Sequence, residues 1–192
     1  MSRFLNLLFV LLFFSCFNEN DNLPTDYLGF LKANDSINIP FNFNLNDSLM
    51  IIRNSRENIY LPISNSNDSI KVNSPFFEDF LMFVEFKDSF SGFYYNKSLK
   101  RKIPFFAKPG THRFNFNNND YKNFDGKWKM VFNYDDEAFS AELMAIQHKN
   151  QISGTVRTET GDYGFMQGVV NGKKISISNF NGYRAYMING DL

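Results

Sequence analysis

From residue 25 onward, the chain consists mainly of short stretches in which apolar and polar residues alternate. Over residues 37–45 the alternation is broken only at Pro40, and this period of two places every second side chain on one face of a strand. No window before residue 135 sustains a helical period. The pattern therefore predicts an all-β fold, an antiparallel meander that forms a barrel-like or two-sheet module.

The expected strands fall into two groups, separated by Pro109-Gly110. They cover residues 37–45, 49–52, 59–63, 69–72, 80–86, 90–95 and 103–107 in the first group, and 125–132, 138–147, 151–157, 163–170, 174–180 and 183–188 in the second. Residues 138–147 are also rich in helix formers, but their alternation favours a strand. We expect a first β half over 25–110 and a second over 111–192, incomplete at its C-terminus. An aromatic residue near a glycine at the start of each suggests two similar halves.

The N-terminal residues 1–16 have the composition of a lipoprotein signal peptide. The apolar run over residues 4–14 would reach about 16 Å as a helix, roughly half of the ~30 Å hydrocarbon core of a bilayer. Cys16 follows at once, after a serine, and this resembles a bacterial lipobox, although two preceding phenylalanines are bulkier than that pattern prefers. We expect lipidation of Cys16, with 17–24 as a flexible tether, and a location in the cell envelope, at its periplasmic face or outer membrane. The alternative is an ordinary signal peptide in which Cys16 is only an apolar residue.

Composition narrows the chemistry that this chain supports. Lys and Arg number 20, as do Asp and Glu, so there is no surplus charge to attract nucleic acid. Cys16 is the sole cysteine, which excludes an internal disulfide and a CxxC redox pair. His112 and His148 lack metal-ligand spacing and are interpreted as solvent-facing or turn residues. The acids at 135–137 are interpreted as a solvated turn, and we expect no metal, no cofactor and no catalysis in this chain.

Three turns share the sequence Asn-Asp-Ser and end at Ser36, Ser48 and Ser69. Asn, Asp and Ser side chains bond their own backbone, so each sequence predicts a hairpin corner. Asp-Ser followed by Ile or Leu also resembles the O-glycosylation motif of Bacteroidetes envelope proteins, and Asn-Asp-Ser matches the N-x-Ser sequon. The three serines are therefore candidate glycosylation sites as well as plain turn residues.

Aromatic residues supply the candidate ligand contacts. Trp128 lies in a Gly-Lys-Trp sequence that resembles the Gly-x-Trp at the start of lipocalin-type barrels, although core packing explains a lone tryptophan equally well. Phe93, Tyr94 and Tyr95 are consecutive, and period-two alternation prevents all three from pointing inward. An exposed Tyr94 or Tyr95 would be able to stack on a sugar or contact a partner.

Short motifs in both halves carry a family resemblance. They lie at residues 39–43 and 102–105 in the first half, and at 124–128, 152–156, 160–163, 168–170, 179–182 and 185–186 in the second. Together they resemble an N-terminal region of Bacteroidetes TlpA-like lipoproteins. In such proteins this β region precedes a thioredoxin-like domain whose CxxC exchanges thiols and disulfides, and an N-terminal lipid anchors the whole. The resemblance implies a membrane partner and a thioredoxin-like domain or envelope protein as a second partner.

The sequence departs from that family because it holds no thioredoxin-like domain and no second cysteine. No catalytic residue carries over, and either a truncated chain or a naturally short module fits. Our first hypothesis is a lipid-anchored, non-catalytic envelope module that positions a redox domain or contacts its partner. The alternative is a stand-alone lipocalin-like binder of a small apolar or glycan ligand. An open, aromatic-lined barrel cavity would favour the alternative, and a filled interior would count against it.

Overall fold

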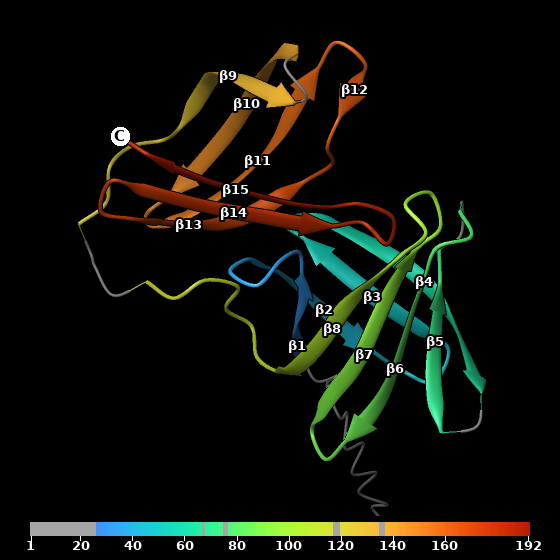
Figure 1. Cartoon of the computed structure of the whole chain (residues 1–192). Coiled ribbons are helices and arrows are strands. Elements are labelled where there is room, and N and C mark those ends of the chain that lie inside the picture. The colour runs from blue at the N-terminus through green and yellow to red at the C-terminus, as the bar shows by residue number, and fades with distance from the viewer. Residues whose placement is uncertain (1–25, 67, 75–76, 117–119, 135–136) are drawn as a thin grey trace, which may run out of the picture.

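The computed structural model describes residues 26–66, 68–74, 77–116, 120–134 and 137–192. These residues form two antiparallel β units without any helix, which confirms the predicted all-β fold class (Figure 1). Within this part of the chain, no helix offers the length and apolar character that crossing a bilayer requires. The first unit is a closed barrel and the second is an open, curled sheet.

The barrel is a meander of eight strands in which each strand pairs with the next along the chain. Its strands are β1 (Asp26–Lys32), β2 (Asn38–Leu45), β3 (Leu49–Asn54), β4 (Glu57–Ser66), β5 (Ser69–Asn73), β6 (Phe80–Phe86), β7 (Ser89–Asn96) and β8 (Arg101–Pro109). Antiparallel pairing of β1 with β8, with Gly29 opposite Ala107, closes the ring. Closure leaves the barrel without a free sheet edge, the feature that otherwise invites association with other chains.

Aromatic side chains fill the barrel. Phe41, Phe43, Phe83 and Phe105 are each at most 2% exposed, and the Phe83 and Phe105 ring centroids lie 5.3 Å apart. A Cβ added at Gly29 would lie 2.8 Å from Cζ of Phe41, closer than packed carbon atoms approach. The barrel centre is therefore a hydrophobic core, built from the inward half of each alternating strand.

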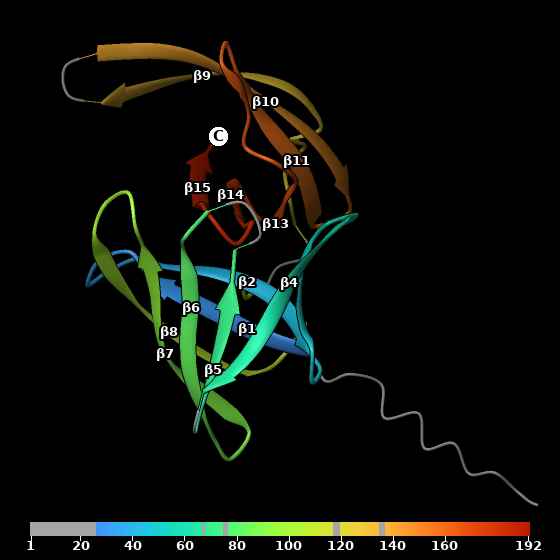
Figure 2. The same ribbon diagram turned by 90° about the vertical axis from the view of Figure 1, so that its right-hand side faces the viewer.

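In the second unit, neighbouring strands are paired in the order β15-β14-β13-β11-β10-β9. The short β12 pairs with β11, outside this order. Its strands are β9 (Gly126–Tyr134), β10 (Glu137–His148), β11 (Gln151–Thr158), β12 (Gly161–Asp162), β13 (Met166–Asn171), β14 (Lys174–Phe180) and β15 (Ala185–Asp191). Figure 2 shows this sheet curled around its own inner face, with β9 and β15 as its two edges. Residues 138–147 belong to β10, so the strand prediction there is confirmed.

The curled sheet has its own core on the inner face. Its buried members include Leu143, Ile152, Val156 and Ile177, which the strand register places on one face of the sheet. Gly168 permits the tight curl, since a methyl group there would overlap the Ser176 carbonyl oxygen on the neighbouring strand. The two halves thus share the meander connection but differ in closure, one being a barrel and the other an open sheet.

The sheet covers one end of the barrel through β14 (Figure 1). Phe180, at the end of β14, is fully buried and packs within the barrel core, with its ring centroid 4.8 Å from that of Phe41. The seam expected at Pro109-Gly110 falls where β8 ends, and residues 111–116 lead away from it toward the sheet. The two units are consequently held together by shared core packing as well as by the connecting chain.

Candidate functional site at the junction of barrel and sheet

The predicted lipidation site and signal lie outside the described residues. This applies to Cys16, to the signal peptide 1–16 and to the tether 17–24. The described chain begins at Asp26, the first residue of β1. These predictions therefore stand as sequence interpretations.

Two of the three predicted Asn-Asp-Ser corners are confirmed as turns. The Asn34 Oδ1 accepts hydrogen bonds from the backbone N–H groups of Ser36 and Ile37, both at 2.9 Å. Asn46 receives the equivalent bonds from Ser48 and the residue after it, at 2.9 and 2.8 Å. Ser36 and Ser48 are exposed, as a modification site requires. The third corner begins at residue 67, outside the described residues, and Ser69 is half-buried at the start of β5.

The predicted division of the aromatic cluster on β7 is visible in the structure. Tyr94 points into the barrel and is 2% exposed, so it belongs to the core and is not an external stacking surface. Its hydroxyl lies 2.8 Å from Asp79 Oδ2 and 2.6 Å from the Tyr183 carbonyl oxygen. Burial, followed by the bond to Asp79, raises the pKa of the Tyr94 hydroxyl. Tyr95 points outward, where its ring centroid lies 5.3 Å from that of Phe80.

Trp128 belongs to the second sheet and not to the barrel. It lies on β9, partly buried against the inner core of that sheet, and its indole N–H donates to the Phe124 carbonyl oxygen at 2.8 Å. The Gly-x-Trp of a lipocalin-type barrel closes a barrel end, whereas here Phe180 fills that position. Core packing is the role that the structure gives to Trp128.

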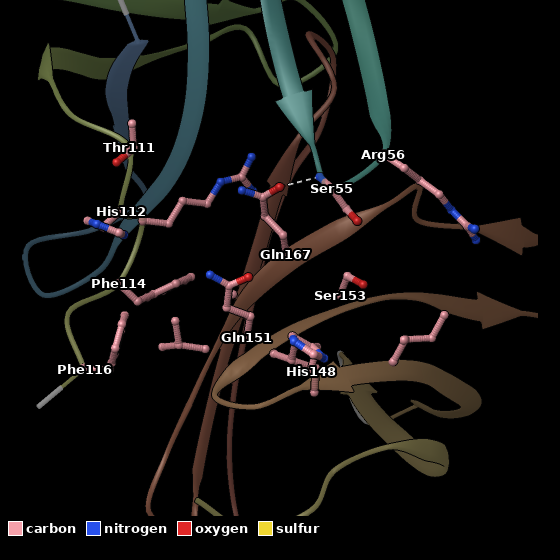
Figure 3. Close-up of a pocket in the computed structure, with 15 residues that line it drawn as sticks. Ser55, Arg56, Thr111, His112, Phe114, Phe116, His148, Gln151, Ser153 and Gln167 are labelled. Atoms are coloured by element: carbon pink, nitrogen blue, oxygen red, sulfur yellow. Dashed lines mark hydrogen bonds between the residues drawn. The ribbon is translucent and has the colours of Figure 1, made fainter. Parts of the chain in front are cut away.

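Both histidines are exposed, as predicted, yet they line the same cavity. His112 lies on the segment after the barrel, and His148 ends β10. In Figure 3 they lie on opposite walls of that cavity. Among the described residues, no group of three or more His, Cys, Asp or Glu side chains gathers in a way that would hold a metal ion.

A buried arginine, Arg113, joins the two units. The residue is 7% exposed, and its guanidinium donates to Asn42 Oδ1 at 3.0 Å, to Asn54 Oδ1 at 3.0 Å and to the Arg53 carbonyl oxygen, all on the barrel. It also donates to the Ser178 carbonyl oxygen on β14 at 2.7 Å. Four hydrogen bonds from one planar group fix the barrel and the sheet in one geometry.

The acceptors around Arg113 are neutral. Burial lowers the pKa of the Arg113 guanidinium to about 9, which leaves it charged at neutral pH. Amide and backbone oxygens compensate the charge where a carboxylate would be usual. Next to it, Ser178 donates from its hydroxyl to the Pro40 carbonyl oxygen at 2.6 Å, and Asn54 donates to the Phe180 carbonyl oxygen at 2.8 Å.

Beside this network lie two adjoining cavities, of about 490 and 480 Å³. They share Ser55, Arg56, Ile146 and Ser153, and we call the pair the junction cleft. One wall is the β3–β4 turn of the barrel, the second is the segment 111–116, and the third is the outer face of β10, β11 and β13 (Figure 3). Volumes of this size match those of small-ligand sites.

The junction cleft is lined by polar side chains that can bind a ligand. They are hydroxyls, amides, arginines, histidines and the ammonium of Lys127, and none of the described residues that line the cleft is Asp, Glu or Cys. The arrangement can hold a ligand by hydrogen bonds, charge and ring contacts.

Sequence reasoning did not identify Arg113, Arg56 or Phe165 as junction residues. Arg113 lies in an irregular segment, and its position three residues after Gly110 is the only sequence feature that indicates a boundary role.

Comparison of the chain with models of protein families, with curated proteins and with solved structures finds no match. The site therefore has to be interpreted from its own chemistry.

Proposed function

We propose that this chain is a lipid-anchored, non-catalytic β module of the cell envelope. The observation that carries the proposal is the position of Cys16, the sole cysteine, directly after an apolar run too short to span a bilayer. Two or more acyl chains on one cysteine would hold a protein at a membrane, since each buried methylene contributes about 0.8 kcal/mol. The filled, closed barrel supports a structural role for the module.

Metabolic labelling with a fatty-acid analogue in the native host tests the anchor. Wild-type protein and Ser15→Ala, which keeps the cysteine, should both take up label, whereas Cys16→Ser should not. Label retained on Cys16→Ser would contradict the proposal. The matched Ser15→Ala control separates loss of the thiol from general damage to the signal.

The role of the anchored module, as the TlpA-like resemblance implies, is to position a redox domain or to contact its partner. Rigid attachment through Arg113 and Phe180 supports this role, because a spacer has to transmit a fixed geometry. Cross-linking in intact cells followed by mass spectrometry should identify a thioredoxin-like partner with a CxxC. If the cross-linked proteins consistently lack a CxxC, the redox part of the proposal is wrong.

The second candidate function is the binding of a small ligand. The filled barrel core counts against a ligand inside the barrel, as in a lipocalin-like binder. The observation in favour of binding is the junction cleft, which lies outside the barrel between the two units. Ligand screening against a protein of residues 17–192, which lacks the signal and Cys16, tests this function independently of the anchor, and a screen without any binder would argue against it.

A further inference from the structure

Arg56 presents an unneutralised positive charge to the junction cleft. It lies on the β3–β4 turn, is exposed, and holds its guanidinium carbon 4.7 Å from the Phe165 ring centroid. Within the described part of the chain it forms no ion pair, whereas Lys127, also on the cleft wall, pairs with Glu142 at 3.5 Å. The ring contact restrains the guanidinium and leaves its N–H groups available.

The charge on the cleft walls is one-sided. Arg56 and Arg113 both line it, and the described lining residues include no carboxylate, although the chain as a whole carries as many acidic as basic residues. Low-dielectric walls of one charge sign raise the local concentration of ligands of the opposite sign. The cleft therefore favours an anion.

The remaining lining groups suit a hydroxylated ring. The side chains of Ser55, Gln151 and Ser153 have no hydrogen-bond partner among the described residues, so they are available to a ligand. The Thr155 hydroxyl in the adjoining cavity is buried and likewise has no partner within the described chain. Phe116, 36% exposed, adds an aromatic face at the opposite end. Hydroxyl and amide groups interleaved with aromatic rings can hydrogen-bond the hydroxyls of a sugar while a ring packs on its apolar face.

From these observations we infer that the junction cleft binds an acidic oligosaccharide, with a carboxylate of the sugar on Arg56. Ser55, Gln151 and Ser153 receive the ring hydroxyls, and Phe165 and Phe116 pack against sugar faces. Two adjoining cavities of about 490 and 480 Å³ give room for more than one sugar ring. The inference deepens the ligand-binding function proposed above and does not depend on the lipid anchor.

Isothermal titration of a protein of residues 17–192 tests the inference with trigalacturonate as the probe. The acidic trisaccharide should bind at least tenfold more tightly than a neutral galactose trisaccharide, and its affinity should fall when salt rises from 20 to 200 mM. Absence of binding by trigalacturonate would overturn the inference, as would equal binding of the neutral sugar. Equal binding of triglutamate would overturn the sugar class and leave a general anion site. Labelling of Cys16 is unaffected by any of these results, so the two proposals fail separately.

Variants locate the site. Arg56→Gln should weaken trigalacturonate binding about tenfold or more, since it removes a charge-assisted bond. Arg184→Gln is the matched control, because Arg184 also lies over an aromatic ring, Tyr183, at 5.0 Å, but outside the cleft. Ile146→Glu, at a residue 59% exposed and shared by both cavities, should abolish binding by repulsion without disturbing the core. Equal affinities for Arg56→Gln and Arg184→Gln would place the ligand elsewhere and refute the assignment.

Discussion

Replacement of Arg113 by methionine tests whether one buried guanidinium fixes the sheet on the barrel. The substitution keeps an apolar stem of similar length but removes all four hydrogen bonds to the barrel and to β14. Asn42 Oδ1 retains a longer bond from Gln167 at 3.4 Å, whereas Asn54 Oδ1 keeps no other donor among the described residues. We therefore expect a loss of stability and a weakened junction.

The expected magnitude follows from the groups left behind. An unsatisfied buried acceptor costs about 1–3 kcal/mol, and at least one acceptor amide and two carbonyl groups lose a charged donor. Relief from burying the guanidinium charge offsets part of this cost. We expect a net loss of about 3 kcal/mol in the free energy of unfolding for Arg113→Met. With a urea slope of about 2 kcal/mol/M, the unfolding midpoint should fall by about 1.5 M.

The assay is urea unfolding followed by circular dichroism and by Trp128 fluorescence. Arg101→Met is the control, because that exposed arginine makes one bond, to the Ala33 carbonyl oxygen at 3.2 Å, and its loss should cost no more than about 0.5 kcal/mol. The same midpoint for Arg113→Met and Arg101→Met would refute the reasoning. A gain in stability for Arg113→Met would show that the desolvation cost exceeds the hydrogen bonds.

Three further predictions concern the core and the junction. Phe180→Ala should lower the free energy of unfolding by about 3–5 kcal/mol, because Phe180 is fully buried in the barrel end; thermal unfolding measures this, and an unchanged Tm would contradict the packing. Gly168→Ala should cost about 3 kcal/mol or prevent folding, through overlap with the Ser176 carbonyl oxygen, and wild-type urea stability would disprove that contact. The raised pKa of Tyr94 means that folded protein keeps a proton that unfolded protein loses, so stability should decline as pH rises above about 10. Urea midpoints at pH 8 and 11 should show a smaller decline for Tyr94→Phe than for wild type, and equal declines would exclude this linkage.

The strand pattern could be predicted because alternation reports directly on which face of a strand is buried. The same rule cannot predict the contact between barrel and sheet, because it assigns the outward residues of β2 to solvent. Asn42 points outward from the barrel yet is 6% exposed, and Arg113 and Gln167 on β13 both donate hydrogen bonds to its Oδ1. Local sequence carries no signal for such contacts between distant segments.

The candidate site was harder to predict for the same reason. Arg56 and Phe165 are separated by more than a hundred residues, and only the docking of the sheet brings them together. Tyr94 and Tyr95 could be assigned to opposite faces by parity, but parity did not show which one reaches Asp79. Chemistry at an interface between two units depends on their relative placement, which alternation does not specify.

Cell fractionation of wild type and Cys16→Ser in the native host is the most direct test of the lipid-anchored module. Cys16 is the single residue on which the anchor rests. We predict that the wild type sediments with membranes and resists extraction by high salt, while Cys16→Ser is recovered in the supernatant. Recovery of Cys16→Ser with the membranes, in the same proportion as the wild type, would contradict the account.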